Sequence, residues 1–209
     1  MTRIFSAFGV AAIVLMAANE SAAQGLGASA YVSYGSTRFE ATETFETVLG
    51  KTSHVGVGFG GRVDGLWGGL FVDAGVSQQS LEGQRVFVSD GSVFPLGIPM
   101  EITYRPIDIA AGWRFAFNRV LPYVGGGATI VAYRETSDFA QPGDDTDERK
   151  TGALLLAGVD VAVARFVRVG GEFRYRAVTG VLGTGGVSEV FGEDALGGRA
   201  FALRVSVGR

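Results

Sequence analysis

Few side chains in this 209-residue protein could take part in catalysis or metal binding. The chain has no cysteine, which excludes disulfides, thiol nucleophiles and cysteine-ligated metals. It has one histidine, His54, which excludes a multi-histidine metal site. His54 follows Ser53 directly, but a general base must also be oriented by a third group, and no second histidine or H-x-S pair supports it. We therefore expect no catalytic residue here.

Two other motifs suggest ligands only weakly. Gly56, Gly58 and Gly61 match the spacing G-x-G-x-x-G of a dinucleotide-binding loop, which must lie between a strand and a helix. Here the glycines lie inside a segment that alternates like a strand, so a face of small residues explains them better. Residues 143–148 carry four carboxylates that could attract Ca²⁺, but they lack the EF-hand spacing. We expect a solvated loop there, and neither a cofactor nor a metal.

A larger charged set lies on the polar faces of alternating segments. Buried charges are costly unless they are paired, and arginine can pair with a carboxylate through two hydrogen bonds. We therefore expect these residues to form a structural network that plugs the interior, with a narrow or gated pore as the alternative. Same-strand neighbours pair poorly at this spacing, so the arginines near Glu172 should also reach Asp160 and acids farther round the wall. The predicted network is Arg62, Asp73, Asp108, Arg114, Asp160, Arg168, Glu172, Arg174, Arg176 and Arg204.

The segments that position these charges alternate with a period of two, which is typical of strands. In 54–63, Val55, Val57 and Phe59 share one face, while glycines and Arg62 share the other. Segment 123–134 has no clear polar face, so its orientation stays open. The predicted strands are 28–35, 54–63, 70–79, 107–118, 123–134, 151–163, 168–176 and 201–208.

Connection lengths then predict the topology. Short connections at 64–68, 118–122 and 164–167 alternate with long ones at 36–53, 80–99, 135–150 and 177–198, and the long ones hold 14 of the 21 acidic residues. Short periplasmic turns and long extracellular loops are typical of outer-membrane barrels. We therefore predict an all-β fold, an eight-stranded antiparallel up-and-down transmembrane β-barrel. Aromatic residues near the strand ends are expected to form interfacial girdles: Trp67, Trp113, Phe115, Phe117 and Tyr123 at the short turns, and Tyr104, Tyr133 and Tyr175 at the long loops.

The N-terminus has the three parts of a secretory signal peptide. Arg3 is followed by the apolar run 7–18, which is too short to span a bilayer, and then by the small residues Ser21, Ala22 and Ala23. We expect cleavage after Ala23, so that residues 1–23 are the signal peptide and 24–209 the barrel domain. The formal net charge of −3 argues against a nucleic-acid partner.

The segments PIDIAAGWRF (106–115), PYVGGGATIVAYRE (122–135) and VGGEFRYR (169–176) carry a resemblance to a known family. The mature chain resembles the small bacterial outer-membrane β-barrel domain proteins, such as the OmpX- and OmpA-like barrels. The resemblance implies a monomer in the outer membrane of a Gram-negative cell, in contact with membrane lipid and the barrel-assembly machinery. The chain ends in Val207, Gly208 and Arg209 rather than the aromatic residue usual in such barrels.

Three functions fit this architecture. The first is a non-catalytic barrel with a structural role, or with a surface-interaction role through its long acidic loops, which could bind an extracellular partner. The second is a small-solute porin, which requires the network to open. The third is a lipid-modifying outer-membrane enzyme centred on His54, because some barrels of this kind use a histidine with a serine or aspartate. A soluble lipocalin-like barrel is the rival fold, but it would need an apolar interior.

Overall fold

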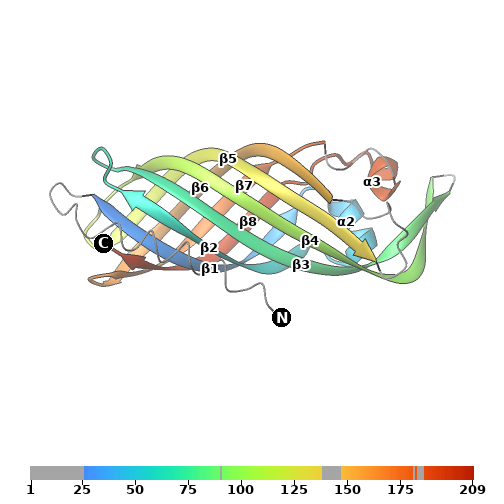
Figure 1. The fold of residues 1–209 in the computed structure, drawn as a ribbon, viewed down its shortest axis with the longest axis horizontal. Coiled ribbons are helices and arrows are strands. Elements are labelled where there is room, and N and C mark those ends of the chain that lie inside the picture. The colour runs from blue at the N-terminus through green and yellow to red at the C-terminus, as the bar shows by residue number, and fades with distance from the viewer. Residues whose placement is uncertain (1–25, 90, 138–146, 181, 183–185) are drawn as a thin grey trace.

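The computed structural model describes residues 26–209, except for 90, 138–146, 181 and 183–185. Eight antiparallel strands close into a barrel in sequence order (Figure 1). The predicted fold is therefore confirmed, while the predicted signal peptide lies outside the described residues. The strands are β1 Gly27–Phe39, β2 Ser53–Asp64, β3 Leu70–Ser89, β4 Ser92–Arg114, β5 Val120–Ser137, β6 Asp147–Ala164, β7 Val167–Ala177 and β8 Gly198–Gly208. Two short helices, α2 (Thr42–Leu49) and α3 (Gly186–Phe191), lie in the long connections at one end.

The outer face of the barrel carries a continuous apolar belt. On β6 the outward side chains from Ala153 to Val163 are all apolar, and at about 3.3 Å per residue and a tilt near 40° they rise about 25 Å. That rise matches the apolar band of an outer-membrane barrel. Exposed arginines end the belt towards the long connections, namely Arg38, Arg105, Arg149 and Arg199. None of the helices among the described residues is long and apolar enough to cross a membrane.

The connections at the opposite end are short and rich in exposed aromatic side chains. Phe117 and Val120 exchange two backbone hydrogen bonds around Asn118, whose φ of 58° fits a tight hairpin turn. Trp67 is 82 % exposed in the turn between β2 and β3, and Trp113, Phe115 and Phe117 also face outward. These four residues lie where a periplasmic girdle is expected.

Three tyrosines assigned to the girdles lie elsewhere. Tyr104, Tyr123 and Tyr133 are 1 %, 1 % and 3 % exposed, and their side chains point into the barrel. The girdle assignment of these three residues is wrong, because they share a face with the inward residues of β4 and β5. Tyr175 does face outward, where its hydroxyl donates to Glu40 Oε1 at 2.8 Å.

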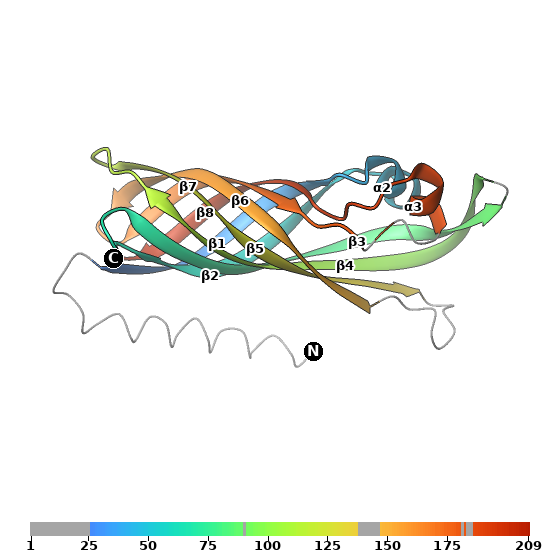
Figure 2. The same cartoon turned by 90° about the horizontal axis from the view of Figure 1, so that it is seen from above.

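The predicted long loop at 80–99 is mostly strand. β3 and β4 continue past Gln78 and Met100, where β2 and β5 stop pairing with them, and form a hairpin that projects beyond the rest of the barrel (Figure 2). We call residues 84–99 the β3–β4 arm. Its register shifts between Gln84 and Val86, and Pro95 and Gly97 explain why the segment reads as a loop in sequence. Segment 135–150 likewise begins and ends in strand.

Candidate functional site: the filled lumen

A cluster of ion pairs fills the middle of the barrel. Glu172 on β7 contacts Arg174 Nε at 2.6 Å, Arg204 Nη1 at 3.0 Å and Arg62 Nη2 at 3.4 Å. Its Oε2 also accepts a hydrogen bond from the Tyr123 hydroxyl at 2.8 Å. The structure therefore brings one carboxylate against three guanidinium groups and a phenol, where each charge has a partner.

Two further acids extend this cluster across the lumen. Asp108 on β4 accepts from both Arg174 Nη1 and Arg176 Nη2 at 2.6 Å. Asp73 on β3 lies 2.9 Å from Arg62 Nε and 3.2 Å from both Arg174 Nη2 and Arg204 Nη1. Strands from both halves of the barrel are thereby joined through its interior.

Aromatic rings hold two of the arginines in place. The guanidinium carbon of Arg62 lies 4.0 Å from the ring centroid of Tyr123 and 4.4 Å from that of Phe71. Arg204 lies 3.5 Å from the Tyr31 ring. Cation–π contacts of this kind are strongest where the charge is desolvated, and both arginines are almost fully buried.

Small residues make room for these rings. A Cβ on Gly60 or Gly75 would overlap Tyr31, and a Cβ on Gly158 would overlap Tyr123. Gly56 and Gly58 also face inward, Gly61 faces outward, and no helix follows them. The arrangement is therefore that of a lumen lined by small residues, and differs from a nucleotide-binding loop.

A second, smaller cluster lies at the periplasmic end. Asp64 at the end of β2 lies 2.9 Å from Arg114 Nη1 and 3.4 Å from Arg168 Nη1. Sequence reasoning placed Asp64 in a turn and left it out of the network. Its alternation with Arg62 was the signal that could have found it, because both residues share the inward face of β2.

The pairing within the network differs from expectation in two ways. Arg174 and Glu172 are neighbours on one face of β7, yet they pair directly. Asp160 lies 3.7 Å from Arg62 Nη1, whereas Arg168, Arg174 and Arg176 pair with other acids. Same-strand pairing is possible because the long arginine side chain turns back along the strand. The expectation about Asp160 is wrong, while the expectation that these arginines reach acids farther round the wall is confirmed.

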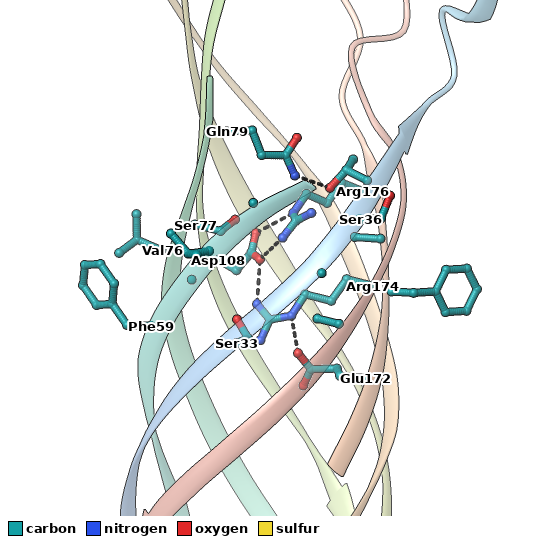
Figure 3. Close-up of a pocket in the computed structure, with 18 of the residues that line it drawn as sticks. Ser33, Ser36, Phe59, Val76, Ser77, Gln79, Asp108, Glu172, Arg174 and Arg176 are labelled. Carbon is teal, nitrogen blue, oxygen red and sulfur yellow. Dashed lines mark hydrogen bonds and ion pairs between the residues drawn. The ribbon is translucent and has the colours of Figure 1, made fainter. Parts of the chain in front are cut away.

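A small cavity lies beside the ion pairs in the lumen. This cavity of about 50 Å³ lies beside Asp108, Glu172, Arg174 and Arg176, which point towards one another in Figure 3. A water molecule needs about 10–15 Å³ of such space, so this cavity has room for a few waters beside the ion pairs. Phe59 and Val76 point away from this cluster, towards the outside of the barrel.

An apolar cluster covers the extracellular mouth. Phe45 and Leu49 of α2 pack inside the extended walls of the barrel, and Phe39 stacks on Phe45 with ring centroids 4.2 Å apart. We call this set the extracellular cap. The cap comprises Phe39, Ala41, Phe45, Leu49, Leu81, Ile102, Tyr104, Val131, Tyr133, Val178 and Leu196.

Helix α2 of the extracellular cap is held in place by the connection between β7 and β8. The carboxylate of Glu193 accepts the backbone N–H of Glu43 at 3.1 Å and that of Thr44 at 2.8 Å. These are the unpaired donors at the first turn of α2, and negative charge there is favourable. Gly50 ends the helix in a left-handed conformation with φ of 66°, and its N–H donates to Glu46 O. The connections after β1 and β7 are therefore joined over the mouth.

The residues considered for catalysis do not come together. His54 and Ser53 lie on opposite faces of β2, where His54 Nε2 lies 3.0 Å from Lys51 O and Ser53 Oγ lies 2.6 Å from Ser36 Oγ. Residues 143–146 of the acidic run lie outside the described residues, and 147–148 belong to β6. Within the described ranges, no group of three or more histidine or acidic side chains could hold a metal ion.

Comparison with known proteins decides the family. The model of the outer membrane protein beta-barrel domain matches residues 8–207. The chain belongs to this family. It is an outer-membrane protein, as the belt of apolar side chains also indicates.

Solved structures share the fold. Ail, the attachment invasion locus protein of Yersinia pestis, is 14 % identical, with a TM-score of 0.53 over 90 % of this chain and 100 % of Ail. A major outer membrane protein from Thermus thermophilus is 11 % identical, with a TM-score of 0.53 over 87 % of this chain and 99 % of its own. The sequence has no significant match among curated proteins. At these identities the likeness concerns the fold alone.

Proposed function

We propose that this protein is a closed, non-catalytic barrel that acts in surface interaction through its β3–β4 arm. The observation that carries the proposal is the arm itself, which projects beyond the rest of the barrel and exposes apolar side chains (Figure 2). Phe87 and Phe94 are directly paired across the two strands and are 56 % and 50 % exposed. Exposed apolar patches commonly mark interaction sites.

The filled lumen supports this function over a porin. Ion pairs occupy the middle of the barrel, and the extracellular cap covers its mouth. Transport would require both to open. The separation of His54 from Ser53 across β2 likewise gives no support to a catalytic site at that position.

The partner we propose is a protein surface with apolar and basic groups. The arm supplies the apolar contact, and most acidic residues of the chain lie in the surrounding long connections. Ail has been crystallised with the heparin analogue sucrose octasulfate, a polyanion. The acidic extracellular connections of this protein do not favour a polyanion, so the partner proposed here carries basic groups instead.

Adherence of cells that display the protein tests this function. Cells with the wild type should adhere to protein-coated surfaces more than cells with Phe87→Ser/Phe94→Ser, and Phe166→Ser in a periplasmic turn serves as the control. Equal adherence of wild type and arm variant would refute the role of the arm.

Conductance in planar bilayers tests the closed lumen separately, because stable channels in the wild type would favour a porin.

A further inference from the structure

An apolar hollow lies on the lipid-facing wall, outside the lumen. Its volume is about 730 Å³, and it is lined by residues of β6, β7, β8, β1 and β2. Gly171 leaves a gap in this wall, since a Cβ there would meet no atom within 4 Å. The side chains around the gap are apolar or aromatic and face outward: Tyr34, Val159, Phe173, Phe201 and Leu203.

Two arginines lie just beyond the extracellular edge of this hollow. Ser36 and Phe201 form its edge and are paired across β1 and β8, and two residues further along the same strands Arg38 is paired with Arg199. The step is about 7 Å along each strand. Both arginines are exposed and share the outward face with Phe201. The hollow therefore ends at a pair of positive charges.

This arginine pair is unfavourable without an anion. Like charges directly opposite one another in a sheet destabilise it. Among the described residues, no carboxylate lies within 4 Å of either guanidinium, and the nearby Glu40 accepts a hydrogen bond from Tyr175 instead. Within the central lumen, by contrast, every arginine lies close to a carboxylate.

We propose that this wall binds one phosphorylated lipid of the outer leaflet. An acyl chain lies in the hollow over Gly171, and the headgroup phosphate lies between Arg38 and Arg199. The position fits this occupant, because the arginines end the apolar belt on the extracellular side, where headgroups begin. Arginine pairs well with phosphate through parallel, charge-assisted hydrogen bonds.

Native mass spectrometry of the folded protein in detergent, titrated with lipid A, tests the site. Wild type should retain one lipid, and Arg38→Gln/Arg199→Gln should weaken retention about tenfold. The control Arg105→Gln/Arg149→Gln removes the same charge from the β4 and β6 side, where Ala132 separates the two arginines. It should bind as the wild type does.

A second pair of variants tests the hollow. Gly171→Leu should fill the gap and weaken retention severalfold, while Ala111→Leu, outward on β4, should leave it unchanged. Lipid A without phosphates should bind weakly to every variant, and free inorganic phosphate should not compete at millimolar concentration. Three results would overturn the proposal. They are an equal loss of lipid retention in both double variants, equal binding of lipid A with and without phosphates, and no lipid retained by the wild type.

Discussion

Glu172 is the residue on which the central network most depends. It contacts Arg62, Arg174 and Arg204 and also accepts the Tyr123 hydrogen bond. Asp160, equally buried, makes one ion pair at 3.7 Å. Removing a charge from a buried network costs most where the remaining groups lose their closest partner.

Glu172→Gln is therefore expected to lower the free energy of unfolding by about 3–5 kcal/mol. Asp160→Asn should cost less than half as much, because Arg62 keeps Asp73 and Glu172 as partners. Urea titration of the protein folded in detergent or vesicles measures both. Losses of no more than about 1 kcal/mol in both variants would mean that water screens the lumen and that the ion pairs contribute little.

The effect of replacing a glycine on the stability of the barrel is expected to depend on what its new Cβ would meet. Gly75→Ala should destabilise the barrel by about 1–3 kcal/mol, because the new Cβ would overlap the Tyr31 hydroxyl. Gly171→Ala is the matched control and should be close to neutral, since its Cβ meets open space. Tyr31→Phe in the Gly75→Ala background should recover part of the loss if the clash with the hydroxyl is its cause.

At the scale of elements, alternation predicted the strands well where one face is uniformly apolar. It also predicts the strand at 123–134, which β5 confirms. It does not predict which face of that strand points inward, because both faces carry small and apolar residues, and Tyr123 and Tyr133 are therefore placed by their distance from a loop instead of by parity. The β3–β4 arm was missed because Pro95, Gly97 and Pro99 interrupt the pattern. The ion pairs could not be derived either, because partners such as Arg174 and Asp73 are 101 residues apart.

Helix α2 is the element whose stability depends on a distant residue. Glu193→Gln should weaken the contact at its first turn and raise hydrogen exchange at the amides of Glu43 and Thr44 about fivefold, corresponding to a cap of about 1 kcal/mol. Glu189→Gln removes a charge from α3 without touching α2 and serves as the control. Unchanged exchange at both amides in Glu193→Gln would show that packing in the cap alone holds the helix.

At the scale of the whole molecule, the fold and its orientation are open to direct test. Closed barrels resist detergent, so the unboiled protein should migrate differently from the boiled protein in electrophoresis and show a β-type circular dichroism spectrum.

The orientation can be tested by labelling single introduced cysteines. Because the chain has no cysteine, an introduced one is the only thiol that a maleimide can label. Ser92→Cys, on the arm, should react with a membrane-impermeant maleimide on intact cells.

Leu66→Cys, in the turn between β2 and β3, should react only after the outer membrane is permeabilised. The orientation predicts this difference, because short turns face the periplasm in outer-membrane barrels. Labelling of Leu66→Cys on intact cells, with Ser92→Cys protected, would show that the barrel has the opposite orientation.

The distribution of charge between the two halves of the lumen has a consequence for the order of folding. Strands β1–β4 contribute Asp64, Asp73 and Asp108 against two arginines, whereas β5–β8 contribute four arginines against Asp160 and Glu172. Within this paired network the net charge is thus −1 in the first half and +2 in the second. The arginines of β7 follow their partner acids in the first half by 66 to 104 residues. An incomplete barrel would hold unmatched acids until β7 arrives, so attraction between the halves favours closure late in assembly, and such distant contacts make that step slow.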